Sequence, residues 1–196
     1  MDEQIHDIGT ELNDEQLMIA VQKGDKTAYE ALVLRYRDDA LRLAYHYLHN
    51  WEDARDISQD AFVKVYLKAD SFDPAQRFRP WFFRILVNHS LNFLNRKKKV
   101  KFLSIFQRSR ENEEAILLDQ LSDDEGIGHE FQNRQMVWKA LAALSGSHRD
   151  VLILHEMQGF KEQEISEMLG CSVGTVKSRL HYAKKRMRRL LSEELK

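Results

Sequence analysis

The segment 160–189 constrains this chain more than any other. It reads FKEQEISEMLGCSVGTVKSRLHYAKKRMRR, two amphipathic stretches separated by a single glycine. Ser172 is a favourable N-cap residue for the second stretch, and Gly170 can end the first one in the left-handed conformation. The pattern predicts two helices joined by a tight turn, the first over about 161–169. Steps of three, four and seven place one apolar stripe along the second helix: Val173, Val176, Leu180, Ala183 and Met187.

The predicted second helix has a polar face opposite that stripe. From 168 to 191 the chain has seven Lys or Arg residues and no acid. Positive charge without acids is favourable beside a phosphate backbone, and short polar or aromatic side chains suit base edges in a major groove. The alternative is an ordinary helical hairpin with a solvated basic end. The pattern favours a DNA-binding helix-turn-helix with these candidate contacts: Thr175, Lys177, Ser178, Arg179, His181, Tyr182 and Lys185.

Composition indicates an all-α protein. The 196 residues are 43% hydrophobic and include only 2 Pro and 8 Gly, and long amphipathic stretches recur without a train of alternating strands. No apolar run approaches the ~20 residues that span a bilayer, and the acidic N-terminus has no signal-peptide core. Cys171 is the only cysteine, which fits a reducing cytoplasm, and we expect it to be a small buried residue in the turn.

Charge is strongly segregated although the net charge is only −1. Residues 74–110 contain ten bases and no acid, whereas residues 111–130 contain eight acids and no base. Together with the basic C-terminal helix, this pattern predicts two nucleic-acid contacts separated by an acidic segment. The alternative is that these charged segments only form helix faces exposed to solvent and bind no nucleic acid.

Four segments are predicted along the chain: a tail (1–13), a compact helical domain (14–100), a flexible acidic linker (101–129) and a second small helical domain (130–196). Within the first domain, we expect a capped helix after Asn13, and further helices at about 26–49, 51–69 and 80–100. Pro80 fits the first position of the last of these.

The predicted helix from Pro80 carries a narrow polar stripe beside a broad apolar face. Trp81, Arg84, Asn88 and Asn92 fall close together on a helical wheel. Asparagine side chains can hydrogen-bond the edges of DNA bases, and Lys or Arg side chains can bind phosphates. The preceding loop adds Phe72, Arg77 and Phe78, a mixture of rings and cations on which single-stranded bases stack. Alternatively, Trp81 and Phe78 are core residues and the asparagines face water.

The predicted helix at 51–69 has an acidic outer side. Its expected inner face is Ala54, Ile57, Ser58, Ala61 and Val65, and its outer face Glu52, Asp56, Gln59, Asp60, Val63 and Leu67. An acidic surface that also exposes apolar groups indicates a basic protein partner. A solvated acidic face is the alternative.

Four passages resemble bacterial sigma-70 factors of the extracytoplasmic-function (ECF) group. GDKTAYEALVLRY resembles the start of region 2, and WEDARDISQDAFVKVY resembles its polymerase-docking segment. FRPWFFRILVNHSLNFLNRKKK resembles its melting and minus-10 segment, and the stretch with GTVKSRL resembles region 4. The resemblance covers about 14–100 and 130–192, in the family's order.

This resemblance implies a non-enzymatic transcription initiation factor without a cofactor. Its implied partners are core RNA polymerase, through the β′ clamp helices and the β flap, promoter DNA and an anti-sigma factor. For polymerase binding it implies Asp53, Asp56, Gln59 and Asp60. The loop with Phe72, Arg77 and Phe78 would capture a flipped-out base. The minus-10 set is Trp81, Arg84, Asn88, Asn92, Arg96 and Lys97, and the minus-35 set is the helix-turn-helix list above.

Departures from the family pattern concern promoter preference. Asn92 stands where many relatives have Asp, and Phe82 stands where many have Leu or Ser. His181 and Tyr182 stand where a pair of basic residues is more common. Two other functions compete with the sigma factor hypothesis. A self-sufficient DNA-binding regulator leaves the acidic face and the Trp/Asn stripe unexplained. A nucleic-acid enzyme would need a catalytic triad, metal ligands or a phosphate loop, and we find none in the sequence.

Overall fold

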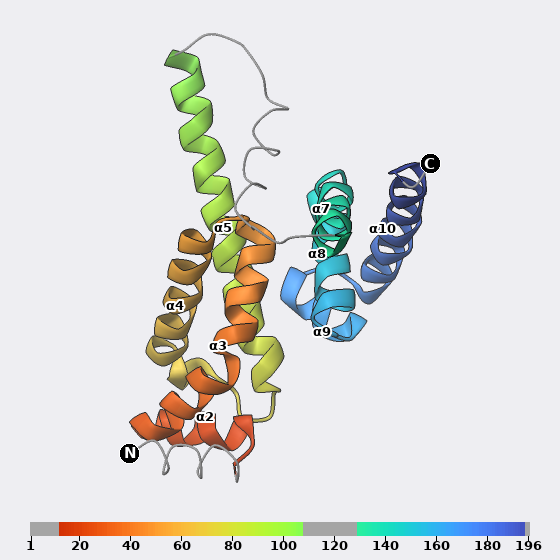
Figure 1. Ribbon diagram of the computed structural model, residues 1–196. Helices are drawn as coiled ribbons and strands as arrows, with labels where there is room; N and C mark the ends of the chain where they lie inside the picture. Colours follow the sequence, from red (N-terminus) through yellow and green to blue (C-terminus); the bar gives the residue numbers. More distant parts are fainter. Residues whose placement is uncertain (1–11, 108–128, 195–196) are drawn as a thin grey trace. The chain divides into compact units, whose positions relative to one another are not determined.

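The computed structural model describes residues 12–107 and 129–194, and every regular element in these ranges is helical. The chain divides into two compact units, Met1–Arg108 and Ser109–Lys196. Each unit packs its own helices around its own core (Figure 1). No helix in the described ranges is long and apolar enough to cross a membrane. The predicted all-α fold class is confirmed.

The described residues of the first unit form four α-helices and one 3-10 turn. They are α2 (Asp14–Gln22), α3 (Lys26–Leu48), α4 (Trp51–Leu67), η1 (Ala69–Ser71) and α5 (Phe78–Gln107). Polar N-caps explain where the first three begin. Asn13 and Gln16 form a capping box, the Asp25 carboxylate accepts from two amides, and Asn50 accepts from the Asp53 amide. Each cap satisfies amides that have no partner inside the helix.

Helices α3, α4 and α5 pack lengthwise, and α2 lies across one end of them (Figure 1). Their shared core includes Leu17, Leu32, Leu43, Phe82 and Leu86, each at most 1% exposed. Burying such side chains stabilises the fold by about 1.5–3 kcal/mol each. This packing fixes the outward faces of α4 and α5, which carry the predicted binding residues.

Helix α5 departs from the prediction at both ends. It begins at Phe78 rather than Pro80, so Pro80 lies at the third position. A proline is still tolerated there because the first turn has no intrahelical amide partners. At its other end α5 continues to Gln107, which is inside the predicted linker 101–129. Residues 108–128, the rest of that linker except residue 129, lie outside the described residues.

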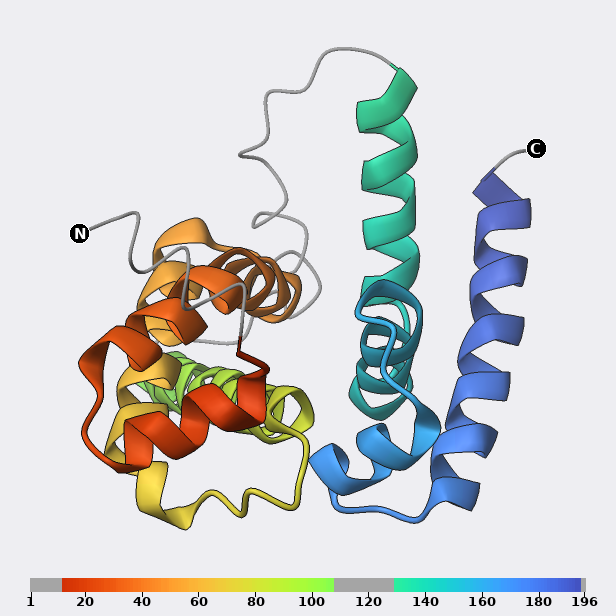
Figure 2. The same ribbon diagram turned by 90° about the horizontal axis from the view of Figure 1, so that it is seen from below.

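The second unit contains α7 (His129–Ala142), α8 (Gly146–Leu152), the π-helical turn η3 (Ile153–Met157), α9 (Glu162–Leu169) and α10 (Val173–Glu194). Figure 2 shows α7 and α10 side by side, with α9 and the turn at one end. Gly170 ends α9 with φ 62°, and the Ser172 hydroxyl accepts from the Thr175 amide at 3.1 Å. The predicted helix-turn-helix, including both of these capping residues, is confirmed.

Candidate nucleic-acid interface

Helix α10 presents the polar face that its sequence predicted. Val176, Leu180 and Ala183 are buried against the rest of the unit. On the other side, Tyr182 is 57% exposed. Lys177, Ser178, His181 and Lys185 are also exposed, whereas Thr175 and Arg179 are half-buried. The face therefore combines cations, hydroxyls and rings over three helical turns, as major-groove contacts require.

Two side chains near this face are held by the unit itself. The Lys184 ammonium lies 2.7 Å from Glu156 Oε1, and His155 Nδ1 lies 2.7 Å from the same oxygen. The hydrogen bond from Lys184 is the main cause that lowers the pKa of the Glu156 carboxyl, and His155 adds to it. The Arg179 guanidinium lies 3.8 Å from the Cys171 sulfur, which is half-buried rather than buried as expected. Lys184 is thus drawn toward η3 and away from the exposed cations.

Helix α5 presents the second predicted polar stripe. Arg84, Asn88, Asn92, Arg96 and Lys97 are all exposed. The Lys97 ammonium lies 2.5 Å from Asp53 Oδ2 of α4 and 5.1 Å above the Phe93 ring. Arg84, Asn88, Asn92 and Arg96 can therefore offer amide groups and cations along one side of α5, whereas Lys97 lies on the side that faces α4.

Three aromatic residues assigned to this stripe and its loop are buried, as the alternative of core residues predicted for Trp81 and Phe78, and their contact with a base stays a prediction. Phe72 is 2% exposed, Phe78 0% and Trp81 7%. The Phe72 ring packs edge-on against the Trp81 ring at 5.1 Å, and the Phe78 ring stacks on the Phe82 ring at 5.9 Å. The helical wheel placed Trp81 beside Arg84, but tertiary packing against the preceding loop covers this first turn of α5. Phe82, the departure from the family pattern, is a core residue with 0% exposure.

The loop between η1 and α5 remains open in its middle. Asp73, Pro74, Ala75, Gln76 and Arg77 are all exposed. Of the three loop residues predicted to capture a base, the structure therefore leaves only Arg77 accessible. The buried rings of Phe72 and Phe78 lie at the two ends of this exposed arc.

The faces of α4 are as predicted. The inner set, Ala54, Ile57, Ser58, Ala61 and Val65, is buried. On the outer side, Asp56, Gln59 and Asp60 are exposed, and Leu67 is 75% exposed. Asp53 is half-buried because it pairs with Lys97. An acidic face that includes exposed apolar groups fits a protein partner.

His89 of α5 is a residue that the sequence did not single out. It is 8% exposed, its Nδ1 lies 2.6 Å from the Lys64 ammonium and its Nε2 lies 3.2 Å from Asp60 Oδ2. Because an ammonium can only donate, Nδ1 is the acceptor and Nε2–H donates to Asp60. Burial lowers the pKa of Lys64, an effect that Asp60 opposes and Arg96 and Lys68 reinforce. His89 thus joins two α4 side chains to α5. The sequence feature that could have indicated this role is the position of His89 on the apolar face of the predicted helix.

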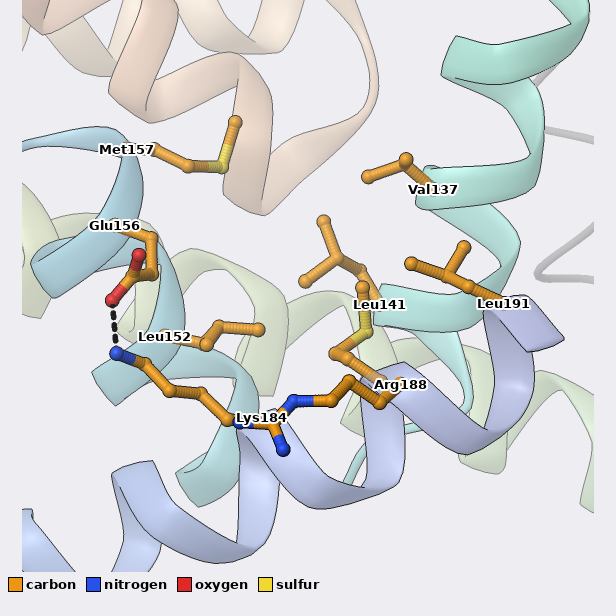
Figure 3. Close-up of a pocket in the computed structure, with 9 residues that line it drawn as sticks. Val137, Leu141, Leu152, Glu156, Met157, Lys184, Arg188 and Leu191 are labelled. Carbon is orange, nitrogen blue, oxygen red and sulfur yellow. Dashed lines mark ion pairs between the residues drawn. The ribbon is translucent and has the colours of Figure 1, made fainter.

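The second unit also has an apolar groove of about 400 Å³ between α7, the end of α8 and α10. The Glu156–Lys184 ion pair lies at its edge (Figure 3). The sequence did not predict this groove because its walls come from three separate segments. They include Val137, Leu141, Leu152, Met157, Met187 and Leu191. In the described part of the chain, no cluster of His, Cys, Asp and Glu could hold a metal ion.

Comparisons with known proteins agree with this division into two units. Residues 32–100 match the family model of sigma-70 region 2, and residues 134–187 match that of sigma-70 region 4. The chain is 32% identical to the ECF RNA polymerase sigma-E factor of Escherichia coli (strain K12) over 176 residues, which cover 89% of this chain and 92% of that protein. This chain belongs to the ECF group of sigma-70 factors.

Other relatives support the same assignment. The ECF sigma factor SigW of Bacillus subtilis (strain 168) is 30% identical over 88% of this chain and 94% of its own length. The solved structure of CnrH in complex with the cytosolic domain of CnrY matches with a TM-score of 0.67 and 25% identity, over 92% of this chain and 97% of that chain. RpoE of Bartonella quintana, solved with the anti-sigma factor NepR, matches with a TM-score of 0.67 and 25% identity over 84% of this chain and 96% of that chain. As a sigma factor, the chain binds core RNA polymerase and directs it to promoters.

Proposed function

We propose that this ECF sigma factor uses three separate surfaces during initiation. The outer face of α4 docks on the β′ clamp helices, with Asp56, Gln59 and Asp60 as its acidic and polar contacts. The stripe on α5 and the loop before it take the minus-10 strand. The exposed face of α10 takes the minus-35 duplex. The chain acts in the cytoplasm as a specificity subunit and catalyses no reaction itself.

One observation carries this proposal: the two exposed polar stripes belong to two separately packed units. Arg84 and Asn88 project from the first unit, and Ser178 and Tyr182 project from the second. Two DNA contacts on separate units can reach two promoter elements at once. A regulator that used only the helix-turn-helix would have no need of the α5 stripe or the acidic α4 face.

Regulation by an anti-sigma factor is part of the proposal. Its support is the solved relative RpoE, which was crystallised with an anti-sigma factor. The apolar groove of the second unit is a candidate contact for the β flap, since exposed apolar walls such as Val137 (37% exposed) and Met157 (43% exposed) favour a protein partner.

The experiment that tests this function adds the purified chain to core RNA polymerase and measures transcription from genomic promoter fragments. We expect transcription that requires both components. Arg84→Ala and Asn88→Ala should impair open-complex formation, detected by reactivity of unpaired thymines, while core affinity stays unchanged. Arg37→Ala is the matched control because Arg37 is exposed on α3 of the same unit. Tight specific DNA binding by the chain without polymerase would contradict the assignment. A loss of core affinity as large as the loss of open-complex formation, in Arg84→Ala or Asn88→Ala, would also contradict it.

A further inference from the structure

Helix α2 holds the start of the loop before α5 through Gln22. The Gln22 side-chain amide donates to the carbonyl oxygen of Ala69 at 2.9 Å and to that of Phe72 at 2.8 Å. These partners are 47 and 50 residues away in sequence. Both amide hydrogens of one side chain are therefore used to fix η1 and the residue that follows it.

The same helix holds the far end of the loop through Glu15. The Glu15 carboxylate accepts a hydrogen bond at 3.1 Å from the backbone amide of Phe78, the first residue of α5. Arg77 precedes this residue and its side chain has no acceptor, and the first turn of α5 contains no acid. Glu15 thus provides from another helix the cap and the negative charge that favour a helix N-terminus.

Between these two anchors lies the exposed arc Asp73–Arg77. Its own backbone makes one turn, in which the Gln76 amide donates to the Asp73 carbonyl at 2.9 Å. The buried rings of Phe72 and Phe78, with centroids 6.0 Å apart, close the base of the arc. Gln22 and Glu15 are seven residues apart, so both side chains project from the same side of α2.

We propose that Gln22 and Glu15 are positioning residues, which hold this arc in the conformation that receives an unpaired base of the minus-10 strand. The inference rests on the proposed function of the loop. Neither residue needs to contact DNA. They act by reducing the number of conformations that the arc must lose when a strand binds, which raises affinity without a new contact.

The location of the two residues predicts which activities they leave alone. Core docking is assigned to the outer face of α4, and minus-35 binding to α10 of the other unit. A freed arc should therefore weaken binding of the minus-10 strand and leave these two contacts intact. A residue that merely stabilises the unit would lower core affinity and the melting temperature together.

The test uses the holoenzyme formed from the full chain and core RNA polymerase. The probe is a fluorescent single-stranded oligonucleotide with the non-template minus-10 strand of a promoter that the wild-type holoenzyme transcribes. We expect Gln22→Met, which keeps the length but cannot donate, to weaken oligonucleotide binding about tenfold, the scale of two lost hydrogen bonds. Its core affinity should stay within about twofold of wild type, well inside that tenfold scale. Gln22→Lys restores donors and should recover part of the loss.

Glu15 gives an independent pair of variants at the other anchor. Glu15→Gln keeps an acceptor and should remain close to wild type, whereas Glu15→Leu should behave like Gln22→Met. If Gln22→Met does not fold, this pair decides. Replacing each base of the oligonucleotide in turn adds a second readout. The wild type should discriminate strongly at one position, and the donor-less and acceptor-less variants should lose discrimination at that position.

The outcomes separate this inference from the proposed function. If the Gln22→Met and Glu15→Leu holoenzymes bind the oligonucleotide as tightly as the wild type does, the positioning role is overturned and the proposed function of the loop stands. A parallel loss of oligonucleotide affinity, core affinity and thermal stability would also overturn the positioning role. A wild-type holoenzyme that binds no minus-10 strand would overturn the proposed function of the loop, and this inference with it.

Discussion

At the scale of single residues, His46 on α3 links the stability of the first unit to pH. Burial is the main cause that lowers its pKa to about 4, and His49 and Arg42 add to this effect. In the unfolded chain the same group titrates near pH 6.5. As pH falls below about 6.5, the unfolded state takes up a proton that the folded state does not, so stability is lost until pH reaches about 4. From about pH 7.5 to about pH 5, this contribution should fall by roughly 2 kcal/mol.

Urea unfolding at several pH values checks this prediction. His46→Gln should remove this part of the pH dependence, because glutamine has no proton to gain. His181→Gln is the matched control, since His181 is exposed on α10 of the other unit. If the free energy of unfolding depends on pH in the same way in the wild type and in His46→Gln, His46 is not the group responsible.

At the scale of elements, α4 shows what a helical pattern can and cannot predict. Periodicity assigned its inner and outer faces correctly because a helix repeats every 3.6 residues. It could not show that Asp53 pairs with Lys97 or that Asp60 contacts His89, since these partners come from α5. The same limit explains Trp81, which the wheel of α5 placed on a polar stripe and the neighbouring loop buries.

The contacts of α4 separate docking from stability. Asp56→Lys should weaken core binding at least tenfold, about the cost of a reversed charge at a docking surface, with no change in thermal unfolding. Asp60→Lys should weaken core binding and also destabilise the unit by about 1–2 kcal/mol, because it places a second ammonium beside His89 and Lys64. Competition binding to core polymerase and thermal unfolding measure the two effects. Asp60→Asn keeps an acceptor for His89 and serves as the control for stability. If Asp56→Lys binds core polymerase with wild-type affinity, the assignment of the outer face of α4 as the docking surface is wrong.

Helix α10 makes a prediction about salt. Each lysine that neutralises a DNA phosphate adds about one unit to the slope of log affinity against log salt concentration. Lys177→Ala and Lys185→Ala should therefore each reduce that slope by about one for holoenzyme on a promoter fragment. Lys184→Ala should reduce it less, because its ammonium is paired with Glu156 at 2.7 Å. Equal slopes for all three variants would show that the ion pair does not hold Lys184 away from DNA.

At the scale of the whole molecule, function depends on two units in one chain. The sequence predicted this division from its segregated charge and from the two capped helical regions on either side of an acidic stretch. The end of the last helix of the first unit was predicted in the basic cluster 96–101, whereas α5 continues to Gln107. The basic cluster 96–101 resembles the last turn of a helix, where Lys and Arg are favoured, so the sequence placed the helix end too early.

A covalent connection between the units should itself contribute to activity. Once one unit is bound to polymerase, the other is held at a high effective concentration near its own promoter element. A protease site inserted between 108 and 128 allows the same sample to be measured before and after cleavage. After cleavage, we expect the chain concentration for half-maximal transcription to rise by about 10²- to 10⁴-fold. The uncleaved insertion variant controls for the insertion itself. Unchanged half-maximal activity after complete cleavage would mean that the two units reach their sites independently, and that the linker contributes no free energy to promoter recognition.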